Sequence, residues 1–139
     1  HLYRRRQRQM CIRDRGMGRM VSKKKDSIGS VMSEREGLNT QDALKLVGFM
    51  PVNKNDRVPA GSHLMSTGSP VDAAHDQGYI TSACFSPNLN CHIGIGFLKA
   101  GDSRIGEVVR LVSPLTGQDH NVQVVSAHFI DPEGERLRA

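Results

Sequence analysis

Short apolar runs separated by turn residues dominate the chain beyond Thr40. In six segments β-branched and other apolar residues alternate with polar ones or glycine, and Pro, Gly and Asn lie between the segments. The predicted strands lie near 45–50, 62–66, 78–84, 93–99, 107–113 and 121–130. No long amphipathic helix separates them. The pattern predicts a mainly β fold, a six-stranded antiparallel barrel of Greek-key type, because closure leaves no strand edge exposed.

The alternation also indicates which side chains point into the barrel. Ile93, Ile95 and Phe97 share one face of their strand, because side chains alternate across a strand with period two. The predicted inward residues are Val47, Ile80, Ile95, Phe97, Val109 and Val124. Gly94 and Gly96 then mark the close approach of another backbone, since no helix pattern follows them to complete a phosphate-binding loop.

The basic charge is confined to the amino end. The chain carries a formal charge of +5. Residues 1–15 contain six arginines and one acid, so the rest of the chain is neutral. We expect this segment to be disordered, because it has no apolar periodicity. Met10–Arg15 resembles the translated read-through of a sequencing adapter, and we interpret the segment as a sequencing scar, with a functional basic arm as the alternative.

Between this segment and the barrel, residues 16–42 read as a short helical lead-in. Ser33 and Glu36 have the spacing of a capping box, and Gly37 ends any helix after one or two turns. We therefore expect short helices before the barrel, which is assigned to residues 43–139.

Length and composition argue against several classes of function. A chain of 139 residues forms one domain of ordinary size, and no apolar run reaches the roughly 18 residues of a membrane span. Three cysteines without CxxC spacing suit a reducing compartment, so a cytoplasmic location is expected. A neutral barrel with few aromatic residues lacks the basic stacking groove of single-strand nucleic-acid binders. We expect neither nucleic acid nor membrane as a partner.

Few residues suggest chemistry by their spacing. Cys84, Cys91 and His92 fall short of two tight ligand pairs for zinc, and no third group orients a Cys–His nucleophile pair. Asp72 and Asp76 lie in a predicted loop, where solvated carboxylates are usual. We predict no metal site and no catalytic residue, which leaves a β-barrel module whose task the residues alone do not identify.

One stretch carries a family resemblance. Gly78–Leu89, which reads GYITSACFSPNL, resembles the hallmark of the carboxyl-terminal barrel in the glycine-cleavage T-protein family, and Ile93–Leu98 resembles the apolar strand that follows it. Lys25–Gly29 and Leu46–Phe49 are similar to upstream segments of that family. Met20–Asp26 and Asp131–Gly134 are similar to one branch, the α subunit of heterotetrameric sarcosine oxidase.

The resemblance covers about residues 16–139 and implies a fragment that is not catalytic alone. The parent would be an enzyme that demethylates sarcosine by flavin chemistry and passes the one-carbon unit to tetrahydrofolate. Tetrahydrofolate is the implied cofactor of this half, with flavin and NAD on other parts of the complex. The implied partners are missing amino-terminal T-protein-like domains of the same chain and the other sarcosine oxidase subunits.

The resemblance also implies where this barrel contributes. The candidate folate-binding or interdomain residues are Thr81, Ser82, Phe85, Ser86, Pro87 and Asn88. The alternatives are the carboxyl-terminal domain of another folate-dependent aminomethyltransferase or of a dimethylglycine or sarcosine dehydrogenase, and a stand-alone binding barrel with a basic arm.

Overall fold

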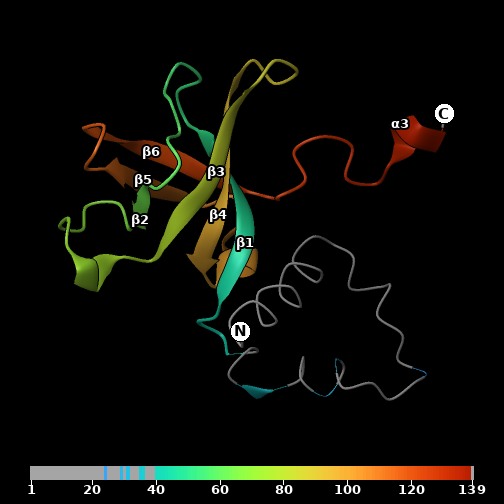
Figure 1. Cartoon of the computed structure of the whole chain (residues 1–139), viewed down its shortest axis with the longest axis horizontal. Coiled ribbons are helices and arrows are strands. Elements are labelled where there is room, and N and C mark those ends of the chain that lie inside the picture. Colours follow the sequence, from blue (N-terminus) through green and yellow to red (C-terminus); the bar gives the residue numbers. More distant parts are fainter. Residues whose placement is uncertain (1–23, 25–28, 30, 32–34, 37–39, 139) are drawn as a thin grey trace.

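Strands dominate the part of the chain that the structure describes (Figure 1). The computed structural model describes residues 24, 29, 31, 35, 36 and 40–138. The strands are β1 (Leu44–Pro51), β2 (His63–Met65), β3 (Gly78–Ser86), β4 (Cys91–Lys99), β5 (Val108–Ser113) and β6 (Gln118–Val125). The 3₁₀ turns η3 (Ala73–His75) and η4 (Gly101–Arg104) connect strands, and α3 (Glu135–Arg138) follows the barrel. The short helices predicted within 16–42 and the basic segment 1–15 fall almost entirely outside the described residues.

The strands close into an antiparallel barrel with the spatial order β1-β4-β3-β2-β5-β6, which confirms the predicted fold. The consecutive strands β2, β3 and β4 lie side by side, and β1 returns to pair with β4, which is a Greek-key arrangement. β1 also pairs with β6 through Gly48↔Val125 to Pro51↔Val122. Because this pairing closes the barrel, no described strand is left as an open edge.

The barrel interior is filled by aliphatic side chains and one phenylalanine. The buried cluster consists of Val47, Phe49, Val58, Leu64, Ile80, Leu98, Val109, Leu111, Val122 and Val124. Val47, Ile80, Val109 and Val124 were predicted inward and are buried. Val58 comes from the β1–β2 loop and belongs to this core, where its side chain lies beside Gly94.

Two of the predicted inward residues face the other way. From Gly94 to Leu98 on β4 the buried positions are Gly94, Gly96 and Leu98, whereas Ile95 and Phe97 are only half-buried on the outside. A period of two defines two faces but does not say which one is inside, and the bulkier face was wrongly assigned to the interior. The interior takes glycine because Ile80 and Val58 already fill the space beside Gly94.

The two glycines of β4 have different neighbours. A Cβ on Gly96 would lie 2.2 Å from the Tyr79 carbonyl oxygen, so Gly96 does mark a close backbone approach, as predicted. A Cβ on Gly94 would instead meet side-chain atoms, with Val58 Cγ1 at 2.7 Å. The prediction of a close backbone approach is therefore right for Gly96 and wrong for Gly94.

The last strand, β6, ends earlier in the sequence than predicted. The apolar residues up to Ile130 favoured a strand over 121–130, but β6 covers Gln118–Val125. Its ladder with β1 ends at Gly48↔Val125, and the Ser126 Oγ then accepts a hydrogen bond from the His128 amide at 3.2 Å, turning the chain. The Phe129 ring packs over Gly48, where a Cβ would lie 2.7 Å from the ring. The apolar run thus continues as a cover on the outside of β1.

Candidate functional site

The six residues implied by the resemblance lie on the β3–β4 hairpin, which projects beyond the barrel in Figure 1. Thr81 forms an irregularity in the ladder, since the register shifts between Ile80 and Ser82. Its hydroxyl donates to the Ile95 carbonyl oxygen at 2.8 Å. Thr81 and Ser82 are both exposed. The bulge bends β3 and turns these two polar side chains toward the outside of the sheet.

The hairpin tip carries an exposed aromatic ring on a well-supported turn. Phe85 is 52% exposed and packs edge-on against the His92 ring, with centroids 5.6 Å apart. Ser86 is buried and its Oγ accepts from the Leu89 amide at 3.4 Å, which supports the turn formed by Pro87 and Asn88. Chemically, the tip offers an apolar wall and short polar side chains to a neighbouring molecule or domain.

The cysteines near this hairpin have different surroundings. Cys91 is fully buried, whereas Cys84 is exposed, and neither forms a disulfide. In the part of the chain that the structure describes, no three His, Cys, Asp or Glu side chains gather in a way that would hold a metal ion. No helix among the described residues is long and apolar enough to cross a membrane.

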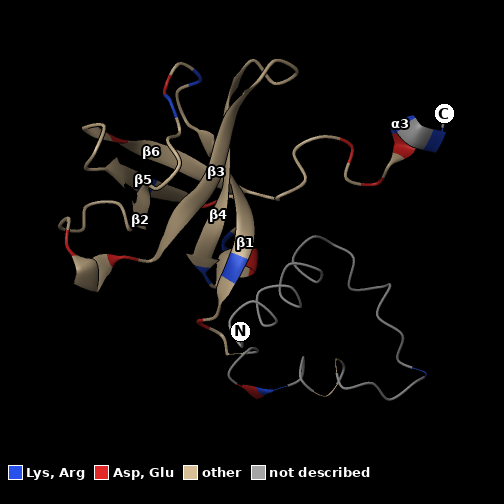
Figure 2. Ribbon diagram, in the orientation of Figure 1, with Lys and Arg blue, Asp and Glu red and all other residues tan. Residues whose placement is uncertain are grey.

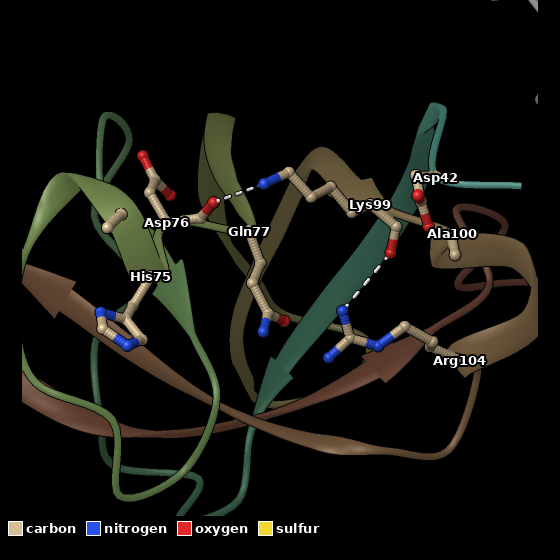
Figure 3. A pocket seen from close by; sticks show the side chains of 8 residues that line it. Asp42, His75, Asp76, Gln77, Lys99, Ala100 and Arg104 are labelled. Atoms are coloured by element: carbon tan, nitrogen blue, oxygen red, sulfur yellow. Dashed lines mark hydrogen bonds between the residues drawn. The ribbon is translucent and has the colours of Figure 1, made fainter. Parts of the chain in front are cut away.

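A second candidate site lies at the opposite end of β3 and β4. Three segments line a cavity of about 320 Å³: Asp42, which lies two residues before β1; η3 with the residues that lead from it to β3; and the end of β4 with η4. Figure 3 shows Asp42, Gln77, Lys99 and Arg104 around it. Nine residues of β3 separate this end from the hairpin tip, roughly 25 Å at the rise of an extended strand. The two sites are therefore separate.

Arg104 supports the floor of this cavity. Its Nε and Nη2 each donate to the Glu107 carboxylate at 2.7 Å, and its Nη1 donates to the Lys99 carbonyl oxygen at 3.4 Å. The guanidinium lowers the pKa of Glu107 by hydrogen bonding to its charged form. These three hydrogen bonds connect η4 to the end of β4 and hold the Arg104 guanidinium beside the cavity.

Two aspartates that flank η3 are held by histidines, and one of them, Asp76, lines the cavity. Asp76 Oδ2 lies 2.8 Å from His63 Nδ1, and its Oδ1 accepts from the Gly78 amide at 3.1 Å. Asp72 accepts from the His75 side chain and backbone amide, and these bonds lower the pKa of Asp72. Both carboxylates were expected to be merely solvated, whereas in the structure each helps to hold the η3–β3 connection.

The sequence gives no signal for this second site. Asp42, Gln77, Lys99 and Arg104 come from three distant segments, and only closure of the barrel brings them together. The hairpin site, by contrast, is continuous in the sequence. In Figure 2 the ribbon is coloured for charged residues at loops and strand ends, while the middle of β3 and β4 contains no charged residue.

Comparison with known proteins identifies a domain family and several similar proteins. A family profile described as the glycine cleavage T-protein C-terminal barrel domain matches residues 45–131. The sarcosine oxidase subunit alpha of Rhizobium meliloti (strain 1021) is 36% identical over 125 residues, which cover 89% of this chain and 13% of that protein. The sarcosine oxidase subunit alpha of Corynebacterium sp. (strain U-96) is 35% identical over 125 residues, covering 88% and 13%.

This chain thus spans 13% of the length of the curated relatives that it matches. Among solved structures, the glycine cleavage system aminomethyltransferase T of Bartonella henselae is similar with a TM-score of 0.49 and 21% identity. That similarity covers 64% of this chain and 22% of the Bartonella protein.

Proposed function

The chain belongs to the family of glycine cleavage T-protein C-terminal barrel domains, and we propose that it is the carboxyl-terminal barrel of a sarcosine oxidase α subunit. The observation that carries this proposal is the 36% identity over 89% of the chain to a sarcosine oxidase subunit alpha. Because the match covers 13% of that protein, the activity would belong to a much longer parent chain. This barrel would contribute one wall of the parent's folate cavity rather than a catalytic group.

The exposed residues of the β3–β4 hairpin are suited to line one side of a tetrahydrofolate site. Phe85 offers a half-exposed ring, and Ser82 and Asn88 are exposed, so their polar side chains are accessible to a ligand. A planar ring packs well on an aromatic face, and short polar groups can orient it. Thr81 would act indirectly, because its hydroxyl is occupied by the Ile95 carbonyl. Tetrahydrofolate would accept the one-carbon unit, and flavin and NAD would be held elsewhere in the complex.

The role of the barrel would be to position the ligand and to exclude water. A rigid hairpin serves this role, because a wall that moves little leaves the cavity closed. The buried Ser86 and the edge-on contact between Phe85 and His92 support such a rigid hairpin. The alternative role of the same residues is to dock the barrel onto the preceding domains of the parent.

The test is Phe85→Ala in the full-length parent. We expect tetrahydrofolate affinity and folate-coupled product formation to fall about 2- to 10-fold, the worth of one aromatic contact. Flavin-dependent sarcosine oxidation should change much less. Leu115→Ala is the matched control, since Leu115 is 96% exposed on the β5–β6 turn. Equal loss of both activities would favour docking, and no loss of either would exclude this hairpin from the site.

A further inference from the structure

His92 shares one face of the β3–β4 hairpin with Phe85. The two residues are direct cross-strand neighbours, and their rings meet at an angle of 70° with centroids 5.6 Å apart. Directly opposite residues of an antiparallel pair point to the same side of the sheet, so both rings lie on one face. Cys84 precedes Phe85 on the strand and therefore points to the other face. Because the two ring planes are nearly perpendicular, together they form a corner.

The imidazole of His92 is available to a further group. In the part of the chain that the structure describes, its two ring nitrogens make no hydrogen bond and no ion pair. Neither nitrogen is fully buried, and the residue as a whole is half-buried. A neutral imidazole has one N–H donor and one acceptor nitrogen. Both functions therefore remain open to a ligand that reaches this face of the hairpin.

Other polar groups are scarce around the two rings. Ala83 and Gly94 are the next residues toward the barrel that point to the same side, and neither has a polar side chain. From Gln77 to Leu98 the sequence contains no Lys, Arg, Asp or Glu, and the hairpin in Figure 2 is tan. Recognition of a polar group on this face of the ladder therefore depends on His92.

An apolar ring beside a hydrogen-bonding ring suits a flat ligand with a polar edge. We propose that His92 is a binding residue of the wall that this barrel contributes to the folate cavity: the ring system of tetrahydrofolate packs on Phe85, and its polar edge forms a hydrogen bond with the His92 imidazole. This inference rests on the proposed function, because it names a further residue of the same site. The edge-on contact with Phe85 also restrains the imidazole, so the hydrogen bond costs little side-chain freedom.

Two substitutions separate the hydrogen bond to the ligand from the ring contact. His92→Phe keeps an aromatic ring opposite Phe85 and removes both nitrogens, whereas His92→Ala removes the ring as well. If His92 only supported the Phe85 ring, phenylalanine would preserve its role. Cys84→Ser is the matched control, because Cys84 is exposed on the opposite face of the same hairpin. Circular dichroism of the same variants of this chain should show unchanged folding, since His92 is not part of the core.

The assay is tetrahydrofolate binding by the full-length parent, measured beside its flavin-dependent sarcosine oxidation. His92→Phe should weaken tetrahydrofolate binding by about 2- to 10-fold, the worth of one hydrogen bond, and should leave sarcosine oxidation unchanged. His92→Ala should weaken binding further, because the Phe85 ring also loses its neighbour. Cys84→Ser should change neither quantity.

The variants also distinguish failure of this inference from failure of the proposed function. Binding that is unchanged in His92→Phe but weaker in His92→Ala would overturn the inference, because His92 would then only support Phe85. Unchanged binding in both His92 variants, with weaker binding in Phe85→Ala, would overturn the inference and leave the proposed function standing. Unchanged binding in all three would overturn both. A loss of sarcosine oxidation as large as the loss of binding would assign His92 to docking between domains and overturn the inference.

Discussion

Gly96 is a position at which one added methyl group should clearly damage the barrel. A Cβ on Gly96 would lie 2.2 Å from the Tyr79 carbonyl oxygen and 2.8 Å from Ile80 Cα. Both are backbone atoms of β3, whose ladder with β4 pairs Gly96 with Ile80. No side-chain rotation can relieve the contact, so Gly96→Ala must push β3 and β4 apart.

The size of the effect follows from that geometry. The contact would have to lengthen by about 0.8 Å to reach 3.0 Å, below which real Cβ atoms are essentially never found. Overpacking a well-packed site costs about 1–3 kcal/mol, and a backbone clash in a closed barrel belongs at the upper end. Alanine recovers about 0.4–1 kcal/mol by restricting the unfolded chain. We expect a net loss of about 2–2.6 kcal/mol, or a Tm lower by about 8–20 °C.

The measurement is thermal and urea unfolding of this chain, followed by circular dichroism. Gly117→Ala is the matched control: Gly117 has a φ of +65° and open space around it, so alanine there suffers only backbone strain of about 1–2 kcal/mol. Gly96 has no such φ. If Gly96→Ala lowers the free energy of unfolding by no more than Gly117→Ala, the close approach of β3 and β4 does not limit the barrel.

Three further outcomes are expected. Gly94→Ala should be partly rescued by Val58→Ala, because the clash at 2.7 Å is with a side chain, and a double-mutant cycle in urea should give a coupling of about 0.5–3 kcal/mol. Additive losses would contradict that contact. Phe49→Ala should lower the free energy of unfolding by about 3–5 kcal/mol, because its side chain is fully buried in the barrel core, and an unchanged urea midpoint would show that the ring is not in the core. Arg104 lowers the pKa of Glu107, so the ion pair contributes stability above the ordinary value of 4.5 and loses it as the pH falls through the lower pKa of the folded state. The urea midpoints of the unsubstituted chain and of the Glu107→Gln variant should differ slightly at neutral pH and converge in acid. A difference that persists in acid would assign the effect to packing.

Much of the fold can be predicted from the local pattern of apolar, polar and turn residues. Alternating apolar positions and the turn residues between them place each of the six strands, with β6 ending earlier than its apolar run suggests. Closure of the barrel is also expected from the sequence, because an antiparallel sheet without covering helices must protect its edge strands. The hairpin with Phe85 is also readable, since its residues are contiguous and carry the family resemblance. Whether they contact folate stays a prediction.

What the tertiary structure decided is which face is inside and which distant residues meet. Ile95 and Phe97 form as good an apolar face as Leu98 with its two glycines, and the glycines are buried because Ile80, Val58 and the backbone of β3 occupy the neighbouring space. The cavity of Asp42, Gln77, Lys99 and Arg104 exists because strand pairing brings three segments to one end of the barrel. Local patterns determine periodicity, because it depends on neighbours along the chain. Side-chain volume and long-range charge act only between segments that folding has already brought together.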